Sequence, residues 1–190
     1  MDSQWPRYEV FEQERPDQPH RNTGSVHAPD AELALQNARD VFVRRPECCS
    51  LWVVPESQIY SWTAESLQAD PGWEAETIML MLAPAPFEIF KKQSQRQSET
   101  YVTHVGQVSA RTPVEALRQA LAQFGTGEAY VWWVVPGRAI LRSQPGDAQS
   151  FFGPARDKPY RSPNFYRVFT QMREAASSDP AGGGPQGGAA

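Results

Sequence analysis

The sequence WVVP occupies residues 52–55 and recurs at residues 133–136, and this repeat predicts the fold of the whole chain. An isoleucine follows each copy at the same spacing, at Ile59 and at Ile140. Short runs of apolar, β-branched residues are typical of buried strands. Because a repeat at this spacing implies two copies of one structural unit, the sequence around each copy should match as well.

The flanking sequence does match. Residues 8–11 (YEVF) correspond to residues 87–90 (FEIF), and both runs mix apolar and polar side chains as a half-buried strand requires. Residues 24–28 (GSVHA) correspond to residues 106–110 (GQVSA), and both lead within two residues into a helix start. We therefore predict two tandem modules, each with the order strand, strand, helix, strand, in an α/β (α+β) protein.

Apolar stripes at helical spacing predict one helix in each module. The first helix follows an N-cap at Asp30 and ends near residues 44–46 (RRP), where positive charge and a proline close it. The second follows a cap at Thr112, has Pro113 in its first turn and ends at Gly125. The expected stripes are Ala34, Leu35, Ala38, Val41 and Phe42 in the first helix, and Val114, Leu117, Ala120, Leu121 and Phe124 in the second.

The repeat also predicts the domain organisation. We expect a first module with its connecting segment at residues 1–82 and a second module with an aromatic C-terminal segment at residues 83–172. Residues 173–190, rich in Gly, Ala and Pro, should be disordered because they offer nothing to bury. The sequence APAP at residues 83–86 resists helix and sheet alike and marks the boundary. The apolar run at residues 77–82 is expected to be a further strand or a buried linker.

Composition argues against several functional classes. A net charge of −4 argues against a nucleic-acid partner, because binding to phosphates needs a concentrated basic face. No stretch is long and apolar enough to span a bilayer, and the first residues lack the features of a signal peptide, so a cytoplasmic protein without membrane contact is expected. The neighbouring Cys48 and Cys49 lack the spaced partners of a zinc site and should be small buried apolar side chains.

No catalytic residue, cofactor site or metal site is predicted. His20, His27 and His104 lie in or beside strand segments, with no Cys or Ser placed as an evident nucleophile, so surface or structural roles are expected. Glycine-rich phosphate-binding motifs do not occur. A di-iron site needs Glu and Glu-x-x-His sets on a helix bundle, and two short helices without histidine cannot provide them.

Four stretches of the first module carry a recognisable pattern, namely residues 5–11 (WPRYEVF), 20–28 (HRNTGSVHA), 34–40 (ALQNARD) and 44–54 (RRPECCSLWVV). In this order they resemble the B subunit family of the bacterial phenylacetyl-CoA epoxidase. That family ends in an Arg-x-Pro-x-Phe-Tyr motif, which occurs here once, as RSPNFY at residues 161–166. The second module departs from the pattern, with Val102 and Thr103 near the place of His20 and Arg21.

The resemblance implies a ubiquitin-like (β-grasp) roll for each module. It also implies a non-catalytic accessory role in a complex for aerobic phenylacetate degradation. The implied partners are a di-iron catalytic oxygenase subunit, which epoxidises the ring of phenylacetyl-CoA, and its ferritin-like companion subunit. Two alternatives stay open, a free-standing protein-binding module that keeps the fold without the oxygenase, and an enzyme whose site is assembled from residues that the sequence does not identify.

A partner interface is predicted from aromatic and basic residues. If Trp133 and Trp52 point into the core, then Trp132 and the corresponding Leu51 point outward, because adjacent strand residues face opposite sides. Apolar outer faces favour packing of the two modules against each other as an intramolecular pseudo-dimer. The motif at residues 161–166 combines prolines with large aromatics and should dock on a partner or on the other module. The predicted interface residues are Trp5, His20, Arg21, Trp132, Arg161, Pro163, Phe165 and Tyr166.

Overall fold

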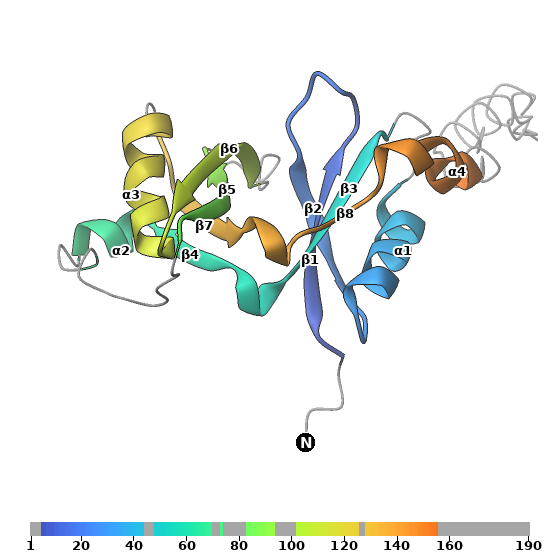
Figure 1. The fold of residues 1–190 in the computed structure, drawn as a ribbon, viewed down its shortest axis with the longest axis horizontal. Helices are drawn as coiled ribbons and strands as arrows, with labels where there is room; N and C mark the ends of the chain where they lie inside the picture. Colours follow the sequence, from blue (N-terminus) through green and yellow to red (C-terminus); the bar gives the residue numbers. More distant parts are fainter. Residues whose placement is uncertain are drawn as a thin grey trace, which may run out of the picture.

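The computed structural model of this protein describes residues 5–43, 48–69, 73, 83–93, 102–125 and 128–155. These residues form a mixed α and β structure with one eight-stranded antiparallel sheet, in the order β4-β7-β5-β6-β2-β1-β3-β8 (Figure 1). The helices are α1 (Ala31–Phe42), α2 (Ala64–Ala69), α3 (Pro113–Phe124) and α4 (Ala148–Phe152). The strands are β1 (Arg7–Gln13), β2 (Arg21–His27), β3 (Ser50–Pro55), β4 (Tyr60–Thr63), β5 (Ala85–Lys92), β6 (Thr103–Ala110), β7 (Val131–Pro136) and β8 (Leu141–Arg142).

The two halves of the chain have the same element order. The series β1, β2, α1, β3 is followed by β5, β6, α3, β7, so the predicted order of strand, strand, helix, strand is confirmed in both modules. In each half the first strand is central and pairs antiparallel with the other two. The registers match as well, because Phe11 lies opposite Trp52 and Phe90 lies opposite Trp133. This register defines which residues of the two halves are equivalent.

The first hairpin of each half contains a glycine that its neighbours require. The hairpin register shifts at the same point in both halves, beside Gly24 and beside Gly106. These glycines have φ of 138° and 154°, which residues with a side chain rarely adopt. A Cβ at Gly24 would lie 2.8 Å from the Phe42 ring, and one at Gly106 would lie 2.5 Å from the Phe124 ring. Each helix therefore closes its last turn onto the hairpin through one phenylalanine.

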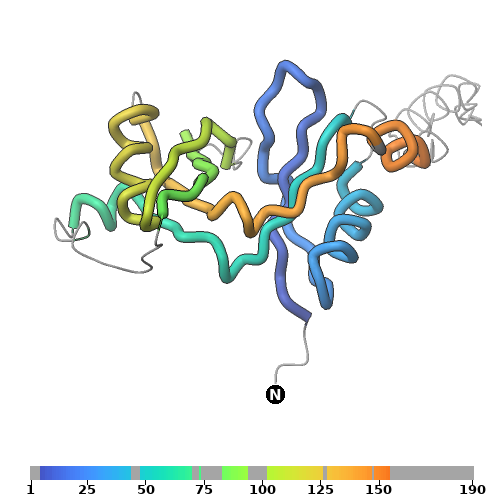
Figure 2. Tube along the Cα trace, in the orientation of Figure 1, coloured from blue at the N-terminus to red at the C-terminus, as the bar shows by residue number. Residues whose placement is uncertain are grey.

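The halves exchange strands. β4 follows the first half but pairs with β7, and β8 follows the second half but pairs with β3. Single 3-10 turns at Glu56–Gln58 and Gly137–Ala139 lie in the two connections. Figure 2 shows these connections running in opposite directions between the two lobes. Each sheet is therefore completed at one edge by a strand from the other half.

The other join between the halves is made by β2 and β6. The backbone N–H of Asn22 donates to the carbonyl of Val102, and that of His104 donates to the carbonyl of His20, both at 2.9 Å. Because Asn22 is equivalent to His104 in the hairpin registers, these two bonds are reciprocal. The join makes the two small sheets one continuous sheet.

Three apolar clusters hold the structure together. One lies between α1 and the sheet of the first half, and a second lies between α3 and the sheet of the second half. Figure 1 shows the two helices on opposite outer sides of the molecule. The third, which we name the junction cluster, takes residues from both halves: Phe11, Val54, Phe90, Val102, Val135 and Ile140, with the partly buried Trp52, Ile59, Trp133 and Ala139. Both faces of each sheet are thus covered, one by a helix and one by the other half.

The predicted helix caps are confirmed. The Asp30 side chain accepts the N–H of Leu33 at 2.8 Å, and the Thr112 hydroxyl accepts the N–H of Glu115 at 3.0 Å. Both caps provide acceptors for N–H groups that the first helical turn cannot pair internally. One member of the predicted stripes is wrong, since Val41 is 49% exposed.

The predicted break at residues 83–86 is wrong in its second part, because β5 begins at Ala85. Pro86 is tolerated in the strand since pairing of β5 with β7 begins only at the next residue, Phe87. The expected strand or linker at residues 77–82, the motif at residues 161–166 and the tail at residues 173–190 lie outside the described residues. The module boundaries and the ubiquitin-like roll stay predictions. None of the described helices is long and apolar enough to cross a membrane.

Candidate functional site

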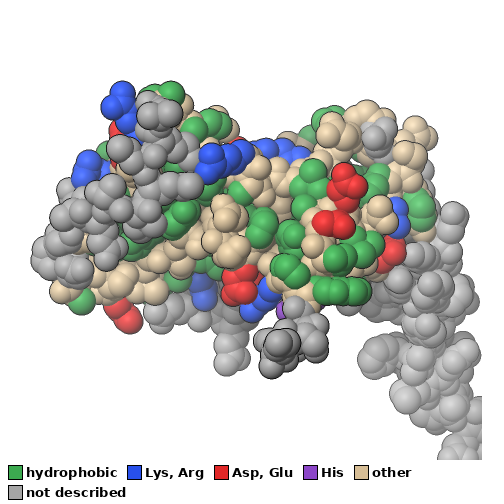
Figure 3. All heavy atoms as spheres, turned by 60° about the horizontal axis from the view of Figure 1, so that its bottom comes forward, with side chains coloured by type: hydrophobic (Ala, Val, Ile, Leu, Met, Phe, Trp, Pro, Cys, Tyr) green, Lys and Arg blue, Asp and Glu red, His purple; other side chains and the backbone are tan. Residues whose placement is uncertain are grey.

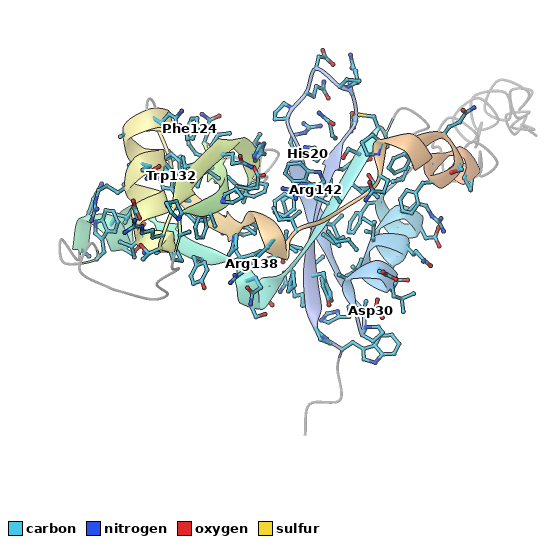
Figure 4. The ribbon with its side chains drawn as sticks, viewed as in Figure 1. His20, Asp30, Phe124, Trp132, Arg138 and Arg142 are labelled. Atoms are coloured by element: carbon cyan, nitrogen blue, oxygen red, sulfur yellow. The ribbon has the colours of Figure 1, made fainter. Side chains whose placement is uncertain are left out.

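Polar side chains from both halves contact the ring of Trp52, at the edge of the junction cluster. The His20 ring stacks on Trp52 with 3.7 Å between ring centroids. The Arg142 guanidinium lies 4.8 Å from the centre of the same Trp52 ring. Figure 4 shows His20 and Arg142 together at the centre of the molecule. Because Arg142 belongs to β8, the strand exchange brings a cation of the second half onto an aromatic side chain of the first half.

A buried carboxylate holds Arg142 in place. Glu88 is only 4% exposed, and its Oε1 accepts hydrogen bonds from Arg142 Nη2 at 2.7 Å and from Gln107 Nε2 at 2.9 Å. His104 Nε2 lies 2.8 Å from Glu88 Oε2. Burial opposes ionisation of Glu88, but the hydrogen bonds from His104 and Gln107 and the charges of His104 and Arg142 outweigh it, so the pKa of Glu88 is lowered. Glu88 is therefore a buried anion neutralised by its neighbours.

The equivalent carboxylate of the first half, Glu9, has different partners. Arg7 Nη2 lies 2.8 Å from Glu9 Oε1, and Asn22 Nδ2 donates to Glu9 Oε2 at 2.9 Å. Glu9 is 6% exposed, whereas the Arg7 side chain is 45% exposed. The first half thus pairs its buried carboxylate with a residue of its own strand, and the second half pairs it with an exchanged strand.

A pocket lies beside Glu9. β4 places Ser61 opposite Trp133, as β8 places Arg142 opposite Trp52, so a hydroxyl stands where the other half has a guanidinium. The pocket has a volume of about 430 Å³ and is lined by Arg7, Glu9, Asn22, Glu56, Ile59, Ser61 and Trp133. We name it the Glu9 pocket. Another pocket of about 370 Å³ lies where β4 and β5 end and β7 begins, lined by Thr63, Ala64, Glu65, Lys92, Tyr130 and Val131.

The structure places a serine next to a histidine, which the sequence analysis missed. His20 Nε2 lies 2.9 Å from Ser50 Oγ. Burial lowers the pKa of His20 to about 3, with further lowering by the positive charges of His104 and Arg142. A general base works best with a pKa near the operating pH, so His20 is poorly suited to activate Ser50. No carboxylate among the described residues hydrogen-bonds to the His20 ring, and the contact is a structural one.

Seven of the eight predicted interface residues fall into three groups. Trp5 is 57% exposed and the Arg21 side chain is 44% exposed, so both are accessible. His20 is 7% exposed and is held inside by Trp52 and Ser50. Arg161, Pro163, Phe165 and Tyr166 lie outside the described residues.

The face turned forward in Figure 3 carries hydrophobic and charged side chains interspersed, without one sign of charge dominating it.

The predicted outward orientation of Trp132 is wrong. Trp132 is 2% exposed and packs in the core under α3, and Figure 4 shows it in the same lobe as Phe124. Leu51, its equivalent, is fully buried under α1. The neighbours Trp52 and Trp133 face the junction instead. Alternation along a strand predicts only that adjacent residues face opposite sides, and here both sides of the sheet are covered.

The cysteines behave largely as predicted. Cys48 is 4% exposed in the core of the first half, while Cys49 is only half-buried. Burial raises the pKa of both thiols, so neither is an activated nucleophile. Within the part of the chain that the structure describes, no group of three or more His, Cys, Asp and Glu side chains could hold a metal ion.

These observations define a class of protein, one built from two matching α and β modules that share a sheet and exchange strands. The sequence model of the family phenylacetic acid degradation B matches the chain twice, at residues 4–73 and at residues 85–173. The chain therefore belongs to this family and carries its sequence in tandem, which confirms the predicted resemblance.

A curated relative shows the same affiliation. Over 55 residues the chain is 53% identical to the B subunit of 1,2-phenylacetyl-CoA epoxidase from Escherichia coli (strain K12). The matched segment covers 29% of this chain and 58% of that protein, so it spans little more than half of the relative's length. No solved structure matches the chain.

Proposed function

We propose that the protein is a non-catalytic accessory subunit of a multicomponent phenylacetyl-CoA epoxidase in phenylacetate degradation. The double match to the phenylacetic acid degradation B family carries this proposal, because it includes most of both modules. The Escherichia coli relative is named as the B subunit of such an epoxidase.

The geometry of the polar groups supports a role without chemistry. The buried carboxylates Glu9 and Glu88 are held in ion pairs, and the buried His20 has a pKa too low for a general base. A catalytic site needs a titratable group that is both accessible and poised near the working pH. The polar network at the junction instead fixes how the halves meet.

The arrangement of the halves supports assembly as the task of the protein. We propose that modules 1–82 and 83–172, each a ubiquitin-like roll, act together as an intramolecular pseudo-dimer, a view that the reciprocal exchange of β4 and β8 supports. The proposed partners are the di-iron catalytic oxygenase subunit and its ferritin-like companion, in the cytoplasm. The accessible Trp5 and Arg21 and the motif at residues 161–166 are the proposed contact residues.

Affinity purification of the full-length chain from its native host, grown on phenylacetate, tests this function. We expect a ferritin-like di-iron protein to co-purify and to be identified by mass spectrometry. Isolation of the chain alone under these conditions would support the free-standing binding module instead. Turnover of acyl-CoA thioesters by the purified chain alone would contradict the non-catalytic role.

The double variant Phe165→Ala/Tyr166→Ala tests the proposed contact motif in the same purification. We expect the partner to be lost while the melting temperature stays unchanged, because aromatic side chains bury much area on association at little entropic cost. Tyr160→Ala, an aromatic change just outside the motif, is the matched control and should keep the partner. A large fall in the melting temperature of the double variant would make the motif part of the fold and overturn its role as a contact.

A further inference from the structure

Each half offers a place for a guanidinium between a buried carboxylate and a tryptophan ring, and an exchanged strand fills only one of the two; the carboxylate of the first half is paired with Arg7 of its own strand instead. In the second half, Arg142 lies between the Glu88 carboxylate, at 2.7 Å, and the ring of Trp52, at 4.8 Å. By strand register, the equivalent position in the first half lies between Glu9 and Trp133. The residue there is Ser61, whose short side chain has no positive charge to offer to the Glu9 carboxylate or to the Trp133 ring.

We propose that the Glu9 pocket binds the guanidinium group of an arginine presented by a partner protein. The filled position around Arg142 serves as an internal template, because it combines the same two elements, a buried carboxylate and a tryptophan ring. Arginine is the side chain that both pairs with carboxylates through a planar fork and stacks on aromatic faces. The volume of about 430 Å³ leaves room for such a side chain.

The charges that line the pocket favour a second cation. Arg7 is shared between two carboxylates, lying 2.8 Å from Glu9 and 3.7 Å from Glu56. The lining residues therefore carry one negative charge in excess. An added guanidinium would balance this charge in a site where Glu9 is already desolvated, and charge-assisted hydrogen bonds are the strong ones in such surroundings.

A difference between the two connecting turns strengthens the comparison. Arg142 Nη1 donates to the carbonyl of Gly137, the first residue of its 3-10 turn, at 3.2 Å. The first residue of the other 3-10 turn is Glu56, which lines the Glu9 pocket. Glu56 has the same backbone carbonyl as Gly137 and adds a carboxylate, so the pocket offers a cation one acceptor that the template lacks at this turn.

Titration of the full-length protein with N-acetyl-L-arginine amide tests the proposal, with the Trp133 indole resonance followed by NMR and assigned through Trp133→Phe. We expect a saturable shift of this resonance. N-acetyl-L-citrulline amide, the uncharged isostere, should bind about tenfold more weakly or not at all, because it lacks the positive charge. An equal response to both amides, or no saturable response to either, would overturn the proposal.

A pair of variants locates the site. Ser61→Arg should fill the pocket from within, as Arg142 does in the other half, and abolish the shift; Ser61 is exposed, so the fold should be kept. Ser57→Arg makes the same change at an exposed position that does not line the pocket, and it should bind the amide as the wild type does. Undiminished binding by Ser61→Arg would overturn the assignment of the site. If the amide binds only to the Arg161→Ala variant, Arg161 of this chain occupies the pocket, and the proposal of a partner's arginine is overturned.

The identity of the partner rests on the proposed function, whereas the chemistry of the pocket does not. The amide titration uses the isolated protein and fails or succeeds without any complex. If an oxygenase co-purifies but the isolated protein does not bind the arginine amide, the proposed function is supported and the arginine site is overturned. If the isolated protein binds the amide but no oxygenase co-purifies, the proposed function is overturned and the arginine site is supported. In the complex, Ser61→Arg should weaken co-purification and Ser57→Arg should not, and equal co-purification of the two variants would overturn the pocket as the partner's site.

Discussion

The two tryptophans that face the junction have the same backbone position and different neighbours. Trp52 carries His20 and Arg142 on its ring. Trp133 lines the Glu9 pocket instead, although each tryptophan makes the same T-shaped contact with a phenylalanine of the other half, Phe11 or Phe90. The difference shows that the apolar pattern of the repeat has been kept while its polar residues have diverged.

This divergence is possible only because both modules belong to one chain. In a symmetric dimer of identical subunits, every contact occurs twice, so a residue cannot fill one site and leave its mate open. Here Arg142 and Ser61 occupy equivalent register positions with different chemistry. A tandem protein can therefore keep one site for internal stability and leave the other open for a partner.

The largest expected effect on stability concerns two equivalent residues that the halves have in common, Phe11 and Phe90. Phe11 and Phe90 are fully buried equivalents whose rings lie 4.3 Å apart at the junction. Phe11→Ala and Phe90→Ala should each lower the free energy of unfolding by about 3–5 kcal/mol, since each leaves a cavity in the cluster that joins the halves. Denaturant unfolding measures the change.

Leucine at the same two positions should cost clearly less and serves as the control for volume. The double alanine variant should lose less than the sum of the single variants because the two rings touch. Additive losses would contradict the direct packing of these two rings across the junction.

A smaller effect should separate the two buried carboxylates. Glu88→Gln removes the charge that Arg142 and His104 face, and we expect a loss of about 3 kcal/mol in the free energy of unfolding. Glu9→Gln should cost less, about 1 kcal/mol, because Glu9 has two side-chain partners, Arg7 and Asn22, where Glu88 has three, and the half-exposed Arg7 can turn to water. Urea titrations at neutral pH measure both. Equal losses would contradict the view that the second half alone depends on an exchanged ion pair.

The pH dependence of the free energy of unfolding should come from His20, which stacks on Trp52. Burial, with the charges of His104 and Arg142, lowers the pKa of His20 from 6.5 to about 3. The unfolded chain takes up a proton below pH 6.5 while folded His20 stays neutral, so the free energy of unfolding falls as the pH drops from 6.5 towards 3. Between pH 7 and pH 5 the loss from His20 should be about 1–2 kcal/mol, because one pH unit corresponds to at most about 1.4 kcal/mol.

His20→Val, which installs the residue type of the equivalent Val102, is the matched variant. Its stability should be flatter than that of the wild type between pH 7 and pH 5, as measured by denaturant unfolding at each pH. Glu88 does not interfere in this range, since its lowered pKa means that its contribution is lost only as the pH falls below 4.5. Parallel pH profiles for the two proteins would show that His20 is not the group responsible.

The smallest effects should be equal in the two halves. Asp30→Ala and Thr112→Ala each remove a confirmed N-cap and should lower the free energy of unfolding by about 1 kcal/mol. Asp30→Asn and Thr112→Ser keep an acceptor and should be close to wild type. Thermal unfolding of the four variants checks this. A cap that costs nothing in one half would show that its helix is held by packing alone.

Local features of this protein could be predicted from the sequence. The repeat gave the order of elements in both modules, and Asp30 and Thr112 were found as caps, because caps and helical stripes involve residues a few positions apart. The family was recognisable from runs such as residues 20–28 for the same reason. His20 was singled out in this way, although its burial and its contact with Ser50 were not foreseen.

The tertiary structure alone decided how the two copies meet. Sequence alternation cannot say which face of a strand lies under a helix when both faces are covered, and so Trp132 was predicted to point outward although it is buried. Nor does any local pattern show that β4 and β8 pair with the opposite half, since strand pairing depends on residues far apart in the chain. Arg142 and the Glu9 pocket follow from that exchange. Their signal in the sequence was a single mismatch in the repeat, Ser61 against Arg142, which gains meaning only once both residues are placed beside a tryptophan.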